Sequence, residues 1–390
     1  MSQELLDQEI VWVDDDRALE EVCEQWKNLP LLAVDTEFMR SKTYYPIAGL
    51  IQVNDGEKNY LIDPTTITDF YPFVEILDNE NILKVIHSCS EDLEVLQHAL
   101  GCLPKNMLDT QIAGAIAGHG FSVGFGKLVS AVLGVDLPKS ETRSDWLQRP
   151  LSQSQLLYAA LDVEYLYALS KKLIEQLEEK QRLSWALDDS STVLNNFFEN
   201  QNPERSYLRF KTAWKLGSVE LAVLKGLSLW REDAAQHKDV PRNRVIKDAA
   251  MFSIAQRMPD QLSQLHKFEG LTERMIRSFG EKLLSIVASA KELDEMDLPA
   301  VLPRPLSSTE RGVLDSLKQD VLALAESLSM PPEILIRKKD YEEILVAARD
   351  QRFPMPKNLQ GWRQDVVGEH VVSAVKSWVS NNSDQSLTAD

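Results

Sequence analysis

Two acidic residues lie two positions apart at the end of the first strongly apolar stretch of this chain. Asp35 and Glu37 follow residues 31–34, which have the length and composition of a buried strand. Residues i and i+2 of a strand point to the same face, so the two carboxylates should project together. Like charges repel, and bound divalent cations would relieve that repulsion. The pair alone fits either a metal site or ordinary surface acids.

A third acidic residue, Asp92, stands near the start of a predicted helix over 91–100. Ser88 and Glu91 have the spacing of a capping box, which would open this helix. An aspartate in the first helical turn also complements the helix dipole. Asp92 therefore has a structural alternative to a role in chemistry.

A tyrosine and an aspartate share one face of a long predicted helix over 154–177. Tyr158 and Asp162 are four residues apart, and side chains at that spacing are neighbours on a helix. A structural hydrogen bond between them is the alternative to a catalytic role.

The elements that would position these side chains mix strands and helices in the first half of the chain. The apolar runs predict further strands at 50–53, 60–62 and 83–87, with a hairpin turn at 54–56. After about residue 205 the strand pattern fades. The periodicity there predicts helices over 216–236, 248–256, 273–291, 309–329, 339–348 and 365–379.

The two helical sets share features that indicate a tandem repeat. VPRNRVIKD at 240–248 is similar to MPPEILIRK at 330–338, with Pro241 matched to Pro332 at an offset of 91 residues. FEGL at 268–271 is similar to LQGW at 359–362, again at an offset of 91. A chance similarity of helix starts is the alternative.

Composition and charge limit the classes of protein that this chain fits. Its 390 residues, 44% of them hydrophobic, suffice for two or three domains. No apolar run approaches the ~18 residues of a membrane span, and the first residues lack the layout of a signal peptide. Three cysteines without zinc-type spacing favour a reducing, cytoplasmic setting. The net charge is −18, but residues 201–290 hold 15 Lys+Arg and 10 Asp+Glu, so this segment attracts phosphate.

Taken in order, the motifs resemble a known set of catalytic elements. An Asp-x-Glu strand, an aspartate at a later helix start and a Tyr-x-x-x-Asp helix follow the order of the DEDD exonuclease superfamily, in its tyrosine branch. The flanking sequence over about residues 10–180 is similar to ribonuclease D. The similar stretches are VDTEF (34–38), LIQV (50–53), HSCSEDL (87–93), LDTQIA (108–113), SDWLQRPL (144–151) and YAALDV (158–163). The helical sets resemble the helicase-and-RNase-D C-terminal (HRDC) domain, the second set more weakly.

This resemblance implies an α/β ribonuclease H-like exonuclease domain, with a mixed sheet flanked by helices, followed by two small all-α helical-bundle domains. We accordingly expect an exonuclease domain at 1–205, a first HRDC domain at 206–295, a linker at 296–308, a second HRDC-like domain at 309–380 and a disordered tail at 381–390.

The resemblance also implies hydrolysis of RNA 3′ ends to 5′-mononucleotides with two divalent ions, Mg²⁺ or Mn²⁺. Asp35 would contact both ions, while Glu37 and Asp162 would hold one of them. Asp92 would act mainly through water near the other. Tyr158 would orient the attacking water, since its ordinary pKa of ~10 keeps it protonated at pH 7.

Candidate substrate contacts extend beyond these acids. Phe38 would stack on a terminal base or belong to the core, and Arg143 and Arg149 would contact phosphate or pair with acids. The basic middle segment would line an RNA path. The full set is Phe38, Thr36, Gln52, Arg143, Arg149, Arg242, Arg244 and Lys247.

The expected partner is RNA, and tRNA precursors with 3′ extensions are the substrate that the resemblance implies. We expect no membrane and a monomer, because no heptad run is present. Two alternatives stay open. One is a 3′→5′ exonuclease acting on DNA, because the motifs do not distinguish the sugars. The other is a non-catalytic RNA-binding scaffold, which the intact set of acids opposes.

Overall fold

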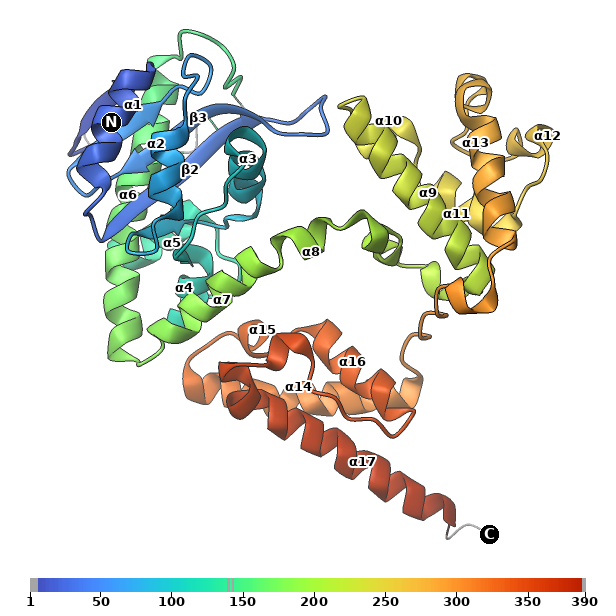
Figure 1. Cartoon of the computed structure of the whole chain (residues 1–390). Coiled ribbons are helices and arrows are strands. Elements are labelled where there is room, and N and C mark those ends of the chain that lie inside the picture. Colours follow the sequence, from blue (N-terminus) through green and yellow to red (C-terminus); the bar gives the residue numbers. More distant parts are fainter. Residues whose placement is uncertain (1–5, 139–140, 142–143, 388–390) are drawn as a thin grey trace. The chain divides into compact units, whose positions relative to one another are not determined.

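A six-stranded mixed sheet forms the centre of the N-terminal part of the chain (Figure 1). The structure is a computed structural model that describes residues 6–138, 141 and 144–387. The strand order is β1-β4-β3-β2-β5-β6, with β2 antiparallel to β3 and parallel to β5. The strands are β1 (Glu9–Val13), β2 (Leu31–Met39), β3 (Ile47–Asn54), β4 (Lys58–Ile62), β5 (Leu83–Ile86) and β6 (Met107–Asp109).

The predicted strands are confirmed, and the one that carries Asp35 and Glu37 extends well past its apolar run. Residues 31–34 are buried, and β2 continues past them to Met39, so Asp35 and Glu37 lie within the strand. β3 and β4 form the predicted antiparallel hairpin. Gly56 in its turn has φ +96, a backbone conformation that glycine adopts without steric cost.

Seven helices accompany the sheet in the described N-terminal part. Helix α6 contacts β2, β3, β4 and β5 and confirms the predicted helix over 154–177. It begins with a capping box between Ser152 and Gln155. The helices are α1 (Asp16–Trp26), α2 (Tyr71–Asp78), α3 (Ser90–Leu100), α4 (Thr110–Ala117), α5 (Phe125–Leu133), α6 (Gln153–Glu179) and α7 (Leu183–Asn195). The mixed sheet with its helices is the α/β architecture expected from the sequence.

The chain divides into two compact units, and the last helical set belongs to the same unit as the sheet. The first unit contains Met1–Met39, Pro46–Asn195 and Leu306–Asp390, and the second contains Arg40–Tyr45 and Asn196–Pro305. Within the first unit, Leu173 of α6 and Ile344 of the last helical set share one hydrophobic core. The last set comprises α14 (Ser308–Leu328), α15 (Pro332–Leu335), α16 (Lys338–Ala348), η5 (Lys357–Leu359), η6 (Gln364–Gly368) and α17 (Glu369–Leu387).

Helix α17 extends into the segment where the sequence predicted a disordered tail. It runs from Glu369 to Leu387, whereas disorder was expected from residue 381. No proline or glycine lies between these two residues, so no residue type that breaks helices ends it earlier.

The second unit is helical and has its own core. Leu224, Ile254 and Leu283 are fully or almost fully buried within it. Its elements are α8 (Phe197–Gln201), η2 (Pro203–Arg209), η3 (Ala213–Lys215), α9 (Ser218–His237), α10 (Arg242–Val245), α11 (Asp248–Arg257), α12 (Leu262–Leu265), α13 (Glu273–Lys291) and η4 (Glu295–Asp297). No helix in the described part of the chain is long and apolar enough to cross a membrane.

The two helical sets share local structure, at an offset that corrects the sequence alignment. Pro241 and Pro331 are each the N-cap of a four-residue helix. Ile246 and Ile336 follow these helices in extended conformation. The offset here is therefore 90 residues, and the pairing of Pro241 with Pro332 was wrong. Pro332 instead occupies the first helical position, where proline is also favoured.

Candidate active site

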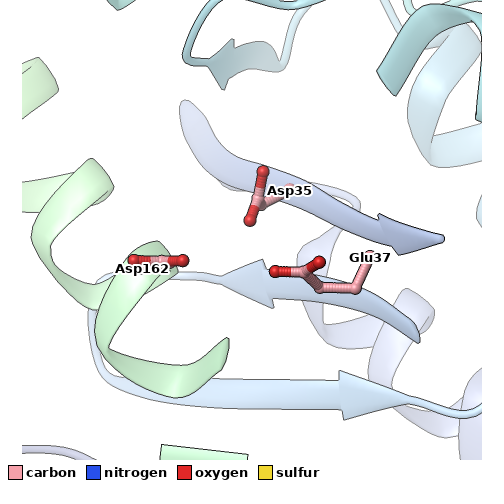
Figure 2. A group of neighbouring side chains, drawn as sticks. All are labelled: Asp35, Glu37 and Asp162. Atoms are coloured by element: carbon pink, nitrogen blue, oxygen red, sulfur yellow. The ribbon is translucent and has the colours of Figure 1, made fainter. Parts of the chain in front are cut away.

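Three carboxylates from two elements converge beside the sheet (Figure 2). Asp35 and Glu37 lie on the same face of β2, and Asp162 approaches them from α6. One carboxylate oxygen from each residue lies within 4.8 Å of the other two. Residues 127 positions apart in sequence, Asp35 and Asp162, thus form one cluster of oxygen donors. Oxygen donors of this kind are the ligands that Mg²⁺ and Mn²⁺ prefer.

Burial and mutual repulsion make the ionised forms of these acids unfavourable. Burial, and then the charge of Asp162, raises the pKa of Asp35 to about 8. Burial and the charges of Asp35, Asp162 and Asp92 raise the pKa of Glu37 to about 9. Burial raises the pKa of Asp162 to about 7, against a hydrogen bond from Tyr158 that lowers it. A divalent cation would stabilise all three carboxylates, so the residues present fit a metal site.

Asp92 lies close to this cluster but is not one of the three convergent acids. Its Oδ1 accepts a hydrogen bond of 2.6 Å from Thr36 Oγ1. Burial and the charge of Asp35 raise its pKa well above the ordinary value. Thr36 alternates with Asp35 and Glu37 along β2, so it points to the other face of the strand. The Thr36 hydroxyl, predicted as a substrate contact, is therefore engaged in a hydrogen bond to Asp92.

Helix α3, which carries Asp92, is held at its start by a residue that the sequence did not single out. The predicted capping box is wrong, because the N-cap is Cys89 and no side chain from that residue caps the helix. Instead, Asp109 accepts hydrogen bonds of 3.0 Å from the backbone N–H groups of Ser88 and Cys89. Ser88 has φ +57, which prevents it from acting as a regular N-cap. Asp109 lay within a motif similar to ribonuclease D, and that was the only signal in the sequence.

Tyr158 faces the carboxylates from α6, one turn before Asp162. Its hydroxyl donates a hydrogen bond to Asp162, and burial together with the charges of Asp162, Glu37 and Asp35 raises its pKa. The phenol is therefore protonated at neutral pH. Its ring lies 6.1 Å from that of Trp146, between centroids. Trp146 in turn approaches the sheet so closely that a Cβ on Gly49 would lie 2.7 Å from its backbone oxygen.

Gln52 and Phe38 are the predicted substrate contacts on the sheet itself. Gln52 pairs with Asp35 in the register of β2 and β3, so the two side chains lie on the same face. Gln52 is fully buried, and within the described residues neither polar atom of its amide has a hydrogen-bond partner. Such orphaned atoms beside the carboxylates fit a site that takes up an ion with its water ligands. Phe38 is half-buried and follows a register shift after Glu37.

Arg149 is engaged by the protein. Its Nε and Nη2 donate to both carboxylate oxygens of Asp63 at 2.6 Å, and its remaining N–H groups donate to the carbonyl oxygens of Gly49, Trp146 and Gln148. All five guanidinium donors are thus satisfied. This favours the alternative in which Arg149 pairs with an acid. Arg143 lies outside the described residues.

The three predicted contacts in the basic segment differ in what surrounds them. Arg242 donates from Nε to Glu232 at 2.5 Å and from Nη2 to the Tyr44 hydroxyl at 2.9 Å. Its guanidinium also lies 4.7 Å from the centroid of the Tyr44 ring. Arg244 and Lys247 are exposed. The geometry therefore leaves Arg244 and Lys247 more accessible to a ligand than Arg242.

Comparison with known proteins decides the family. A family model described as a 3′-5′ exonuclease matches residues 10–178, and one described as an HRDC domain matches residues 220–287. Ribonuclease D from Pseudomonas paraeruginosa is 40% identical over 370 residues, which cover 95% of this chain and 98% of that protein. The chain belongs to the ribonuclease D family. It is therefore a hydrolytic 3′→5′ exoribonuclease that depends on divalent metal.

Solved structures agree with membership of the ribonuclease D family. The crystal structure of Escherichia coli RNase D, an exoribonuclease involved in structured RNA processing, has a TM-score of 0.86 at 34% identity. It covers 95% of this chain and 100% of the E. coli chain. The catalytic core of RRP6 from Trypanosoma brucei shares the fold at a TM-score of 0.54 and 24% identity. Of the functions left open by the sequence, the ribonuclease D relatives favour the exoribonuclease over the DNA exonuclease and the scaffold.

Proposed function

We propose that this chain releases 5′-mononucleotides from RNA 3′ ends at a site built from Asp35, Glu37, Asp92, Tyr158 and Asp162. The observation that carries the proposal is the convergence of carboxylates from β2 and α6 within 4.8 Å. The tyrosine four residues before Asp162 supports an assignment to the tyrosine branch of the DEDD superfamily. Two ions, Mg²⁺ or Mn²⁺, are the proposed cofactors.

The proposed role of each side chain follows from its position in the site. Asp35, Glu37 and Asp162 would hold metal directly, and Asp92, which is bonded to Thr36, would contribute through water. When bound, two divalent cations relieve charge on the phosphate and the leaving oxygen and favour ionisation of water. Tyr158 keeps its proton, which it donates to Asp162, and its oxygen can accept a hydrogen bond from the attacking water and so orient it. The pKa of its hydroxyl is raised, which argues against a role as general base in the metal-free site.

The natural substrates that we propose are tRNA precursors with short unpaired 3′ extensions, processed by a monomer. We propose the division into an exonuclease domain (1–205), a first HRDC domain (206–295), a linker (296–308) and a second HRDC-like domain (309–380). Arg244 and Lys247 are the exposed cations of the first helical domain that would contact RNA. Their contribution would be electrostatic and would weaken with salt.

The decisive experiment is digestion of a 5′-labelled RNA with an unpaired 3′ tail. Wild type, Asp35→Asn and Asp162→Asn are compared in Mg²⁺ and in EDTA, with tRNA precursors as a second substrate. We expect a ladder that shortens from the 3′ end, requires metal and is lost in both variants. A ladder that persists in Asp35→Asn would refute the proposed site. If wild type digested the tailed RNA but left tRNA precursors intact, only the proposed substrate would be refuted.

A separate measurement tests the role of Tyr158. Tyr158→Phe keeps the ring against Trp146 and removes the hydroxyl, so kcat should fall by about 10²-fold. The Mg²⁺ concentration for half-maximal activity should change little, because the three convergent carboxylates remain. An unchanged kcat would exclude the orienting role, and a large shift in the Mg²⁺ requirement would make Tyr158 a residue that supports the metal ligands instead.

A further inference from the structure

A cleft in the second unit brings an indole ring together with two cationic side chains. Its volume is about 580 Å³, and it is lined by Trp214, Lys215, Arg304 and Pro305. None of these residues belongs to the carboxylate site, which lies in the first unit. Volumes of this size accommodate small molecules and single nucleotides.

Trp214 is placed in this cleft without being a core residue. It is half-buried, and among the described residues it is not one of the hydrophobic side chains that pack against the core of the second unit. Its neighbours Ala213 and Leu216 do belong to that core, so the backbone is anchored while the indole faces the cleft. The Nζ of Lys215 lies 5.6 Å from the centroid of the indole ring. A positive charge thus lies over the aromatic ring.

The sequence around the cleft is rich in cations and free of acids. Residues 205–219 contain Arg205, Arg209, Lys211 and Lys215 and no aspartate or glutamate. The other side of the cleft comes from a proline-rich segment, residues 301–306, that contributes Arg304 and also lacks acids. Glu204, at the border of the basic segment, is paired with Lys225 at 2.6 Å, and Arg205 is paired with Glu199 at 2.8 Å. The charges that line the cleft are those of Lys215 and Arg304. Among the residues that the structure describes, no carboxylate lines the cleft, so an anionic ligand is favoured there.

An aromatic ring next to cations is the arrangement that binds nucleotides of single strands. A base stacks on the ring, while the adjoining phosphate pairs with lysine or arginine. Bases in a duplex are stacked on each other and do not offer their faces. An acidic peptide would use the cations but would gain little from the indole. The combination therefore favours single-stranded RNA over both a duplex and an acidic peptide.

We propose that this cleft is a nucleotide-binding subsite for single-stranded RNA, in which one base stacks on Trp214 and its phosphate contacts Lys215 and Arg304. The inference rests on the proposed function, since the strand bound is the substrate of the exoribonuclease. It adds a contact outside the catalytic site, and that contact acts on affinity for longer RNA and not on the chemical step.

Binding of RNA to the full-length chain, without catalysis, tests the subsite. Asp35→Asn in EDTA serves as the background, and the probe is a labelled single-stranded oligonucleotide of about 20 nucleotides. Trp214→Ala should raise Kd by about 5- to 100-fold, and Trp214→Phe should restore part of the affinity. The double variant Lys215→Ala/Arg304→Ala should lower the slope of log Kd against log salt by about 1 to 2.

The control is Lys267→Ala, which removes an exposed charge of the same unit that does not line the cleft. The subsite would be overturned if Trp214→Ala and the double variant bound RNA with the same Kd as this control. This comparison requires that the thermal unfolding of both variants matches that of wild type. If Trp214→Ala is unstable, the Kd of the double variant tests the subsite instead, because Lys215 and Arg304 are exposed. Equal losses for duplex RNA would overturn base stacking, and equal losses for an acidic peptide would overturn RNA as the ligand.

Release of mononucleotides from a trinucleotide in Mg²⁺ separates this proposal from the proposed function. With Asp35 intact, the cleft variants should process the trinucleotide at the wild-type rate, because so short a strand needs only the catalytic site. If wild type and all variants failed to release mononucleotides, the proposed function would be refuted. The RNA-binding measurement would then still test the cleft on its own. A selective loss in the cleft variants would overturn the view that the cleft acts only on affinity for longer RNA.

Discussion

The carboxylate of Asp35 occupies a position that favours metal binding at the expense of stability. It lies with Glu37 and Asp162 in one group of oxygens, and its pKa is raised to about 8 from 3.8. Because the folded pKa lies above the ordinary value, ionisation increasingly destabilises the fold as the pH rises from about 4 to 8. A bound cation reverses this penalty. In the metal-free protein the repulsion among these carboxylates therefore lowers stability, and a bound divalent cation offsets this loss.

Asp35→Asn should accordingly stabilise the metal-free protein while it abolishes activity. We expect the free energy of unfolding in EDTA at pH 8 to rise by about 1–3 kcal/mol, with a smaller gain at pH 5. Urea unfolding at both pH values, with and without Mg²⁺, measures this, and the stabilisation of wild type by Mg²⁺ should shrink in the variant. The exposed Asp136→Asn is the matched control. A less stable Asp35→Asn in EDTA would contradict the electrostatic account.

At the scale of elements, the start of α3 depends on a carboxylate from the neighbouring strand. Asp109 Oδ1 accepts from the N–H groups of Ser88 and Gln111, and Oδ2 accepts from that of Cys89. One side chain thus caps α4 and fixes the residues that lead into α3. Since α3 carries Asp92, Asp109 would act as a positioning residue for the proposed site.

Asp109→Asn replaces one of these acceptor oxygens by an N–H₂ group that faces an N–H donor. We expect a loss of about 1–3 kcal/mol in unfolding free energy, together with a higher Mg²⁺ requirement, because Asp92 loses its fixed position. Asp15→Ala is the control, since it removes an exposed N-cap that accepts from Ala18 N–H. That control should cost about 1 kcal/mol and leave the Mg²⁺ requirement unchanged. If both variants required the same Mg²⁺ concentration, Asp109 would only cap the helix and would not position Asp92.

The start of α14 provides a prediction about pH. Glu310 forms a capping box with Ser307 and an ion pair with Arg349 at 2.7 Å. The Arg349 guanidinium, followed by the bonds from Ser307, lowers the pKa of Glu310 from 4.5 to about 2. Because the folded pKa is depressed, this stabilisation is complete above the ordinary pKa of 4.5 and is lost as the pH falls toward 2.

Glu310→Gln should therefore lower the unfolding free energy by about 1–3 kcal/mol at pH 7. The difference from wild type should shrink steadily between pH 5 and pH 3. Urea unfolding over this range measures it, and the exposed Glu326→Gln serves as control. A difference that stays constant with pH would show that lost packing, and not ionisation, explains the effect.

At the scale of the whole molecule, the last helical set is joined to the exonuclease fold through α7. Arg363 pairs with both carboxylate oxygens of Asp189 on α7 at 2.5 Å. The ring of Trp362 stacks on that of Trp185, with centroids 4.3 Å apart and planes 1° from parallel. A Cβ on Gly118 would lie 2.5 Å from the Ser329 carbonyl oxygen, so the backbones also approach closely. These contacts make the last set part of one compact unit with the sheet.

Arg363→Ala leaves the mostly buried Asp189, within the described part of the chain, with the Trp362 indole N–H as its remaining hydrogen-bond donor. We expect a loss of about 2–4 kcal/mol and faster proteolysis within residues 306–387. Arg352→Ala, which breaks an exposed pair with Asp350, should cost less than about 1 kcal/mol. Unfolding as a single transition in wild type, with a separate early transition in Arg363→Ala, would support the single unit. Similar stabilities of the two variants would argue against it.

The sequence by itself determined which residues are candidates for the site and which elements carry them. Asp35 and Glu37 follow a buried run, and the period of two in a strand directs both to one face. The four-residue spacing of Tyr158 and Asp162 directs both to one face of α6. Each of these inferences depends on neighbours in sequence, for which backbone geometry supplies the distance.

Only the tertiary structure decided which residues meet across long separations. It assigned Asp109 as the cap before α3, where Ser88 was expected, and it paired Arg149 with Asp63 over 86 residues. It also merged the last helical set with the sheet through Asp189 and Arg363. Periodicity and spacing describe one element at a time, whereas these contacts depend on how the elements pack. A capping acceptor, an ion-pair partner or a shared core is chosen by proximity in space, which local sequence does not encode.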